Sequence, residues 1–145
     1  MSFLSDSDII LILDDNEPWS KSCSILYKEE KIGLVGFQGH PIIPTKWSDR
    51  GETLIGYEIY EEYRNKGYAT LACSILLNWG FNKSYQNLLT VKAHTIHGWN
   101  LIGEKVRGNP ASIRVLEKLG AIYDGHHHDD DVGEVLILSL IHISE

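Results

Sequence analysis

Apolar and polar positions along the chain follow two periods, which together predict a domain of mixed α/β structure. Runs rich in apolar and β-branched residues predict strands at 22–28, 32–38, 54–60, 88–94 and 132–143. Polar or proline-containing stretches between them predict a tight turn at 29–31, a loop at 39–51 and a polar loop at 125–131. A further strand is expected to begin at 121–123, and residues 1–16 fit either a short helix or a strand.

Two other stretches repeat with the helical period. The first helix is expected to begin after Gly67 and to run to about Phe81. Its apolar stripe consists of Ala69, Ala72, Cys73, Leu76, Leu77 and Gly80. The second helix is expected at 110–119, because Asn109 suits the N-cap, Pro110 the first turn and Gly120 the C′ position. Its inner face is expected to consist of Val115, Leu116 and Leu119.

The order of these elements predicts how the strands pair. A hairpin is followed by a strand, a helix, a strand, a second helix and a final pair of strands. A strand–helix–strand unit of this length brings its two strands together in parallel. The sheet is therefore expected to be mixed, with helices packed on its faces. No internal repeat, linker or change of composition divides the chain, so residues 1–145 are expected to form one domain.

Composition and charge narrow the classes of partner. The 145 residues are 43% hydrophobic and 23% charged, which is ordinary for a soluble globular domain. A net charge of −7 argues against a nucleic-acid-binding surface. The sequence contains no apolar run of membrane-spanning length and no signal peptide, so we expect no membrane association and a cytoplasmic location. Cys23 and Cys73 are expected to be buried, reduced thiols.

The stretch from Tyr63 to Thr70 carries the strongest chemical signal. It follows a predicted strand and opens a predicted helix, so its glycine exposes backbone N–H groups at a helix N-terminus. Arg64 and Lys66 add two cations beside those donors. The stretch has neither the three glycines of a dinucleotide fingerprint nor the Gly-Lys-Ser/Thr of a Walker A loop. It predicts a phosphate site of another kind; the alternative is a turn that only starts a helix.

The pattern Arg-x-x-Gly-x-Ala at 64–69 resembles the pyrophosphate loop of the GNAT superfamily of acyl-CoA-dependent N-acetyltransferases. Residues 109–120 resemble the second acetyl-CoA motif of that superfamily, and the sequence at 32–37 and 55–57 is similar to the branch that includes ribosomal-protein N-terminal acetyltransferases. The resemblance extends from about Trp19 to Leu140. It implies the GNAT acyl-CoA N-acyltransferase fold with a shortened N-terminus, because a first strand and a helix or two normally precede the hairpin.

The resemblance also implies that acetyl-CoA is the cosubstrate and assigns residues to it. Backbone groups of Ile59 and Tyr60 would contact the pantetheine arm, and Arg64 the phosphates or the nucleotide. The residues expected to surround the pyrophosphate are Asn65, Lys66, Gly67, Tyr68, Ala69 and Thr70. Asn109 would hydrogen-bond the pantetheine near its thiol end, and Ser112 would lie near the leaving sulfur. Leu116 occupies the position where many relatives carry a tyrosine that acts as general acid.

The chemistry further requires a base that takes a proton from the attacking amine. Glu58, on the predicted strand before the loop, is our first candidate; the alternative is that it is only an exposed strand residue. His94 is the second candidate. His94 and His97 could form a metal pair and residues 126–131 a metal cluster, but no further ligand completes the pair and a solvated loop explains the cluster. We therefore expect no metal site.

The sequence therefore predicts an enzyme that transfers an acetyl group from acetyl-CoA to a primary amine by direct attack on the thioester. The acceptor could be a small molecule or a peptide, and the protein a monomer or a homodimer. The alternative is a catalytically weak acyl-CoA-binding sensor or remnant, which the short N-terminus and the leucine at 116 would favour. Nucleotide or phosphosugar binding without CoA is disfavoured by the motif at Asn109.

Overall fold

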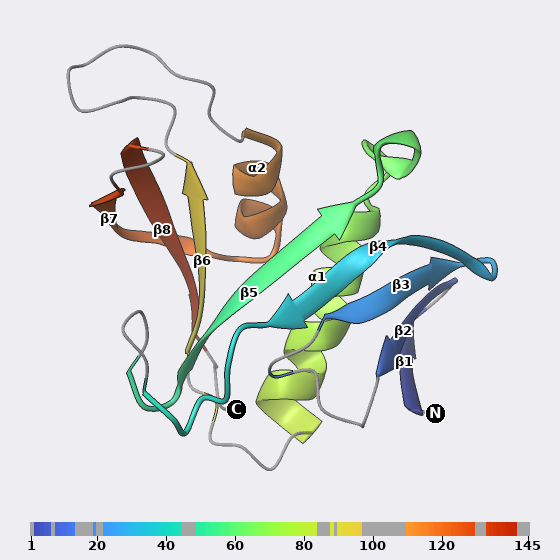
Figure 1. Cartoon of the computed structure of the whole chain (residues 1–145), viewed down its shortest axis with the longest axis horizontal. Coiled ribbons are helices and arrows are strands. Elements are labelled where there is room, and N and C mark those ends of the chain that lie inside the picture. Colours follow the sequence, from blue (N-terminus) through green and yellow to red (C-terminus); the bar gives the residue numbers. More distant parts are fainter. Residues whose placement is uncertain are drawn as a thin grey trace.

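The structure is a computed structural model, which describes residues 2–6, 8–13, 19, 22–44, 49–83, 88, 90–96, 110–129 and 133–141. From residue 23 onward, the strands and α-helices follow one another in the expected order (Figure 1). The strands are β1 (Ser2–Asp6), β2 (Ile9–Leu13), β3 (Cys23–Tyr27), β4 (Glu30–Phe37), β5 (Glu52–Ile59), β6 (Thr90–Ile96), β7 (Ile122–Asp129) and β8 (Gly133–Ile141). The helices are α1 (Tyr68–Asn78) and α2 (Pro110–Lys118), with a short 3-10 turn, η2 (Glu61–Tyr63), and a π-helical turn, η3 (Trp79–Lys83).

The strands form one mixed sheet in the order β1-β2-β3-β4-β5-β6-β8-β7. Neighbouring strands are antiparallel except β5 and β6, which are parallel and are joined through α1. This confirms the predicted mixed sheet and the parallel pairing across the strand–helix–strand unit. Helix α1 lies behind β4 and β5 in Figure 1 and packs against β1, β2, β4 and β5, whereas α2 packs against β6 and α1.

The core lies between α1 and one face of the sheet. In β3, β5 and β6, buried residues recur at alternate positions, as in a strand with one face in the core. On α1 the buried residues are Ala72, Cys73, Ile75, Leu76 and Leu77. Trp19 is part of the core, with its ring 4.9 Å from the ring of Phe37 and 5.1 Å from that of Trp79. Both cysteines are free and buried, as predicted.

Three sequence predictions need correction or completion. Residues 2–6 and 9–13 form two paired strands, which decides between the helix and the strand expected at the N-terminus. The tight turn lies at Lys28 and Glu29 rather than at 29–31, so β4 begins at Glu30. The polar loop predicted at 125–131 is wrong, because residues 126–129 pair with residues 133–136 in the β7–β8 ladder. That polar run is tolerated because β7 is the edge strand of the sheet.

Two further findings concern the elements ahead of β3 and the length of the helices. Ahead of β3, the described residues form two strands and no helix. No helix in the described ranges is both long enough and apolar enough to cross a membrane.

Candidate functional site

Strand β5 is paired differently along its two edges. On the β4 side, the register runs from Gly33 opposite Ile59 to Phe37 opposite Ile55. On the β6 side, the register covers only residues 52–54 of β5, opposite residues 90–92. Beyond that point the two strands continue to Ile59 and Ile96 and diverge (Figure 1).

The hydrogen bonds at the two ends of the β4–β5 ladder show which backbone groups face the diverging side. The N–H of Gln38 donates to the Leu54 carbonyl at 2.7 Å, and the N–H of Tyr60 donates to the Ile32 carbonyl at 2.8 Å. In an antiparallel pair the bonded residues alternate, so even-numbered residues of β5 bond toward β4. The backbone groups of Tyr57 and Ile59 therefore point toward the β6 side, past the last registered pair.

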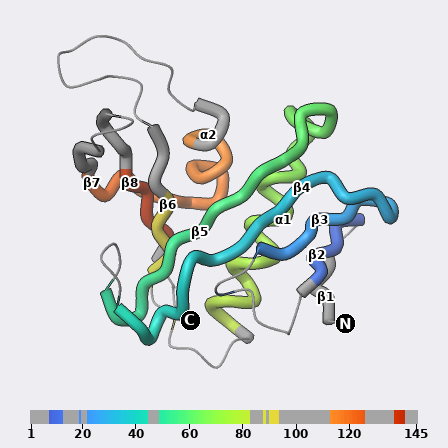
Figure 2. The backbone as a smooth tube through the Cα atoms, viewed as in Figure 1, coloured from blue at the N-terminus to red at the C-terminus, as the bar shows by residue number. Residues whose placement is uncertain are grey.

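The connection after β5 leads into the N-terminus of α1 through an exposed loop (Figure 2). Asn65 and Gly67 have positive φ angles of 64° and 82°, and Gly67 is the N-cap residue of α1. No side chain caps this helix end. The first helical bond runs from the N–H of Leu71 to the Gly67 carbonyl, so the preceding N–H groups have no helical acceptor. Such donors at the positive end of a helix dipole suit an anion.

Arg64 is held at the start of this loop by the end of β5. Its Nε donates to the Ile59 carbonyl at 2.8 Å. Tyr60 uses both of its backbone groups within the protein, because its carbonyl accepts from the Tyr63 N–H at 2.9 Å. Of the two residues predicted to offer backbone groups to the pantetheine arm, only Ile59 keeps its N–H directed to the β6 side. The sequence does not indicate Tyr57, because the hydrogen bonds between β4 and β5 decide which residues of β5 face the β6 side.

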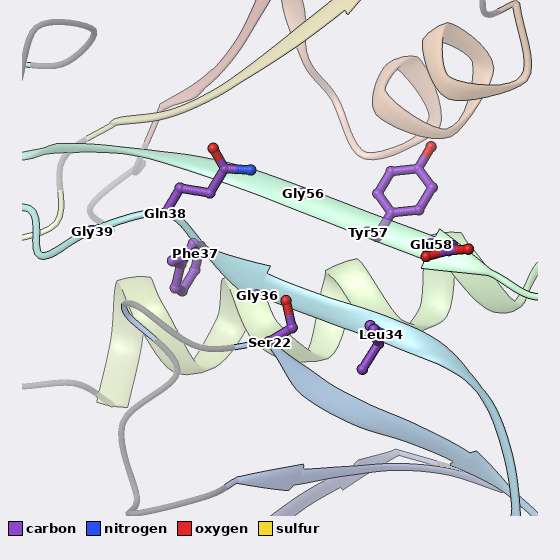
Figure 3. Close-up of a pocket in the computed structure, with 9 residues that line it drawn as sticks. All are labelled: Ser22, Leu34, Gly36, Phe37, Gln38, Gly39, Gly56, Tyr57 and Glu58. Carbon is purple, nitrogen blue, oxygen red and sulfur yellow. The ribbon is translucent and has the colours of Figure 1, made fainter.

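A cavity of about 480 Å³ lies along β4 and β5 (Figure 3). Its lining residues are Ser22, Leu34, Gly36, Phe37, Gln38, Gly39, Gly56, Tyr57 and Glu58. Gly36 lies opposite Gly56, and Leu34 lies opposite Glu58. Leu34, Gly56 and Glu58 are less buried than Val35, Ile55 and Ile59, so they belong to the sheet face away from α1. Gly36 is buried but lies on the same face as its partner Gly56. The floor of the cavity is therefore bare backbone, and the exposed Glu58 carboxylate stands at one end.

The remaining predicted site residues are placed only through their backbones or not at all. Ser112 belongs to the first turn of α2, and His94 lies in β6 opposite Ile137, but their side chains are outside the described part of the structure. Asn109 and His97 lie outside the described residues. Leu116 is 1% exposed within the core, as predicted for the inner face of α2.

The described side chains bear on two kinds of chemistry, metal binding and catalysis by a thiolate. Among the described side chains, no group of three or more His, Cys, Asp or Glu residues could hold a metal ion; the side chains of 126–131 are not among them. Burial raises the pKa of the Cys73 thiol to about 12, so this residue remains protonated at neutral pH and provides no thiolate nucleophile.

Comparisons with known proteins agree with this geometry. The family model described as an acetyltransferase (GNAT) domain matches residues 6–122. Among solved structures, a GNAT-family acetyltransferase from Bacillus anthracis is 21% identical with a TM-score of 0.64, and the match covers 84% of this chain and 66% of that one. RimL, a ribosomal L7/L12 α-N-protein acetyltransferase in complex with coenzyme A, is 16% identical with a TM-score of 0.63, covering 83% and 60%.

A third solved structure widens the range of acceptors among the relatives. An F149A mutant of the spermidine N-acetyltransferase SpeG from Vibrio cholerae is 16% identical with a TM-score of 0.61, covering 92% of this chain and 64% of that one. The chain thus spans less than two thirds of the length of each of these three structures. No curated protein matches the sequence. Because the matching family model covers well over half of the residues, the chain belongs to the GNAT acetyltransferase family.

Proposed function

We propose that this protein transfers an acetyl group from acetyl-CoA to a primary amine by direct attack of the amine on the thioester. The observation that carries this proposal is the combination found around β5. One edge of the strand diverges from its neighbour beside an uncapped helix N-terminus, and the sheet face away from α1 holds a cavity with a carboxylate. The GNAT family uses acetyl-CoA, and both parts are needed for acetyl transfer from it.

The loop before α1 would hold the pyrophosphate of CoA. The N–H groups of the first turn of α1 supply donors, and the positive φ of Gly67 turns the chain so that these donors converge. Lys66 is exposed beside them and adds positive charge. Arg64 keeps guanidinium donors available while its Nε holds the end of β5. The pantetheine arm would follow the β6-facing edge of β5 at Tyr57 and Ile59, toward the first turn of α2, which contains Ser112 and directly follows Asn109 in the sequence.

Each step of the transfer then has a candidate group. An ammonium must lose a proton before it can attack, and Glu58 would accept this proton directly or through a water molecule; His94 is the second candidate. The amine nitrogen forms a bond to the thioester carbonyl carbon, and a backbone N–H on the β6-facing edge of β5 would stabilise the oxyanion. The carbon–sulfur bond then breaks, the thiolate of CoA leaves with a hydrogen bond from Ser112, and the remaining extra proton of the nitrogen passes to the thiolate directly or through water.

The cavity favours an acceptor with a single positive charge. Among its described lining residues, Glu58 is the one ionisable carboxylate, and Gln38 and Ser22 are neutral hydrogen-bonding groups. A polyamine carries several ammonium groups and would need several carboxylates to offset their desolvation. A peptide N-terminus carries one ammonium next to amide groups that Gln38 and Ser22 can bond. We therefore favour a peptide N-terminus or a small monoamine as acceptor.

A catalytically weak acyl-CoA-binding protein is the second candidate. The observation that favours it is Leu116, whose buried aliphatic side chain cannot donate a proton to the leaving thiolate. Both candidates require CoA binding, so they differ only in turnover.

Release of free CoA thiol, measured with a panel of acceptors, separates the two candidates. The panel contains peptides with different first residues, a simple monoamine, spermidine and an aminoglycoside. The proposal expects turnover with at least one single-charge acceptor. CoA binding without thiol release from any amine would favour the binding protein, and absence of CoA binding at high micromolar concentration would exclude both.

A further inference from the structure

The hairpin between β3 and β4 contacts the candidate phosphate loop at both of its ends. Its turn residues Lys28 and Glu29 have φ angles of 49° and 70°, the left-handed pair that a two-residue type I′ turn requires. This turn places Tyr27 directly opposite Glu30 in the ladder. Side chains of directly opposed residues project to the same face of a sheet. Both therefore reach the side on which α1 lies.

Each member of this pair holds one flank of the loop. The hydroxyl of Tyr63, the residue immediately before Arg64, donates to Oε2 of Glu30 at 2.7 Å. The ring of Tyr68, the residue immediately after Gly67, lies 4.7 Å from the ring of Tyr27. Residues 64–67 thus lie between two side-chain contacts, and both contacts are made to the residues that flank the hairpin turn.

We propose that the β3–β4 hairpin is a clamp that holds the phosphate loop in its binding conformation, with Tyr27, Glu30 and Tyr63 as positioning residues. This inference rests on the proposed function, because the loop is taken to bind the pyrophosphate of CoA. A loop that must be ordered on binding loses affinity to conformational entropy, and a loop that is already ordered does not. The clamp residues act through the loop and are not placed against CoA.

The charges around the clamp support a positioning role rather than direct phosphate contact. Glu30 is an anion and would repel a phosphate, but its Oε2 accepts the Tyr63 hydroxyl. This hydrogen bond raises the pKa of Tyr63, with smaller contributions from burial and from the charges of Glu30 and Glu62. The cation of Lys28 lies against the Tyr27 ring, with Nζ 5.2 Å from the ring centre.

The test compares two acetyl donors that differ in the part the loop would hold. Acetyl-CoA carries the pyrophosphate, whereas S-acetylpantetheine ends before it. In Tyr63→Phe and in Tyr27→Leu, we expect KM for acetyl-CoA to rise roughly fivefold with kcat unchanged, as for loss of one modest contact. The kcat/KM for S-acetylpantetheine should remain at the wild-type value. Glu30→Gln keeps an acceptor oxygen and should retain most of the affinity. The control is Glu61→Gln, which removes a nearby exposed charge outside the clamp.

Amide hydrogen exchange of the unliganded protein gives a second readout that does not require CoA. We expect the peptide covering residues 64–70 to exchange faster in Tyr63→Phe than in the wild type or in Glu61→Gln. The clamp is refuted if both donors lose activity equally, if neither does, or if exchange of this peptide is unchanged. A wild-type protein that failed to bind CoA would refute the proposed function alone, and the exchange result would still decide whether the hairpin orders the loop.

Discussion

The two edges of β5 belong to the same eight residues but are used differently. The β4 edge is paired in register from Ile55 to Ile59 and leaves no room for an extra atom at Gly33. The β6 edge is paired only as far as Leu54, and the chain beyond it turns into the uncapped end of α1. A substitution on the first edge should therefore change stability, and one beside the second edge should change binding or rate.

The largest effect is expected on the paired edge. A Cβ at Gly33 would overlap the backbone oxygen of Glu58 and lie 3.0 Å from the Ile59 Cα, and backbone atoms cannot rotate away. Gly33→Ala should therefore lower the free energy of unfolding by roughly 3 kcal/mol or more. Urea denaturation followed by circular dichroism measures this. A variant as stable as the wild type would mean that the two strands are not held in this register.

The next effect concerns the cavity on the face away from α1. If Glu58 is the base, Glu58→Gln should lower the acetylation rate about 100-fold with little change in CoA affinity. Steady-state kinetics across a range of pH, with the exposed Glu62→Gln as the matched charge control, measure this. A rate that is unchanged at every pH would transfer the role to His94 or to water.

A smaller effect is expected at the start of α2, across the diverging strands. Ser112→Ala should slow turnover about tenfold, because a thiolate leaving group needs only a hydrogen bond, worth about 1 kcal/mol. The exposed Ser74→Ala on α1 is the control for loss of a helix serine. A Ser112 variant with reduced stability and normal turnover would show that the serine only caps its helix.

The smallest effect is expected at Gly56 in β5, which is compared with Gly33 in the paired strand β4. A Cβ at Gly56 would lie 2.8 Å from Nε2 of Gln38, the end of a flexible side chain that can move. Gly56→Ala should therefore stay within about 1 kcal/mol of the wild type in stability. Because it narrows the cavity, we expect KM for the acceptor to rise about threefold, as for loss of part of one contact, with KM for acetyl-CoA unchanged. Equal destabilisation by Gly33→Ala and Gly56→Ala would remove the distinction between the paired edge and the cavity floor.

Sequence patterns predicted the helices well because their signals are local. The apolar stripe of α1, the proline at the start of α2 and Gly120 after it required only neighbouring residues. The strand ladders depend instead on distant partners. The polar stretch at 126–129 became a strand because β8 pairs with it. The hairpin turn could not be placed within one residue from its charged sequence, although a shift of one residue sends Glu30 to the other face.

Prediction of the candidate site was limited in the same way. The loop at 64–70 was visible in the sequence because a glycine between a strand and a helix has a local meaning. Tyr57 was missed, and Tyr60 was named although its backbone groups already have partners, because both depend on which residues of β5 bond to β4. The clamp formed by Tyr27, Glu30 and Tyr63 joins residues more than 30 positions apart, so no local pattern indicated it.

The central claim is that the loop at Gly67 binds CoA, and titration calorimetry of one pair of variants tests it most directly. Gly67 and Gly120 have similar φ angles of 82° and 91°, and a Cβ at either would meet nothing within 4 Å. Valine at either position carries a similar backbone strain, but only Gly67 lies at the proposed phosphate site. We predict that folded Gly120→Val binds CoA as the wild type does and that Gly67→Val binds at least about tenfold more weakly. Equal affinities in the two folded variants, or no binding by the wild type at high micromolar CoA, would contradict the account.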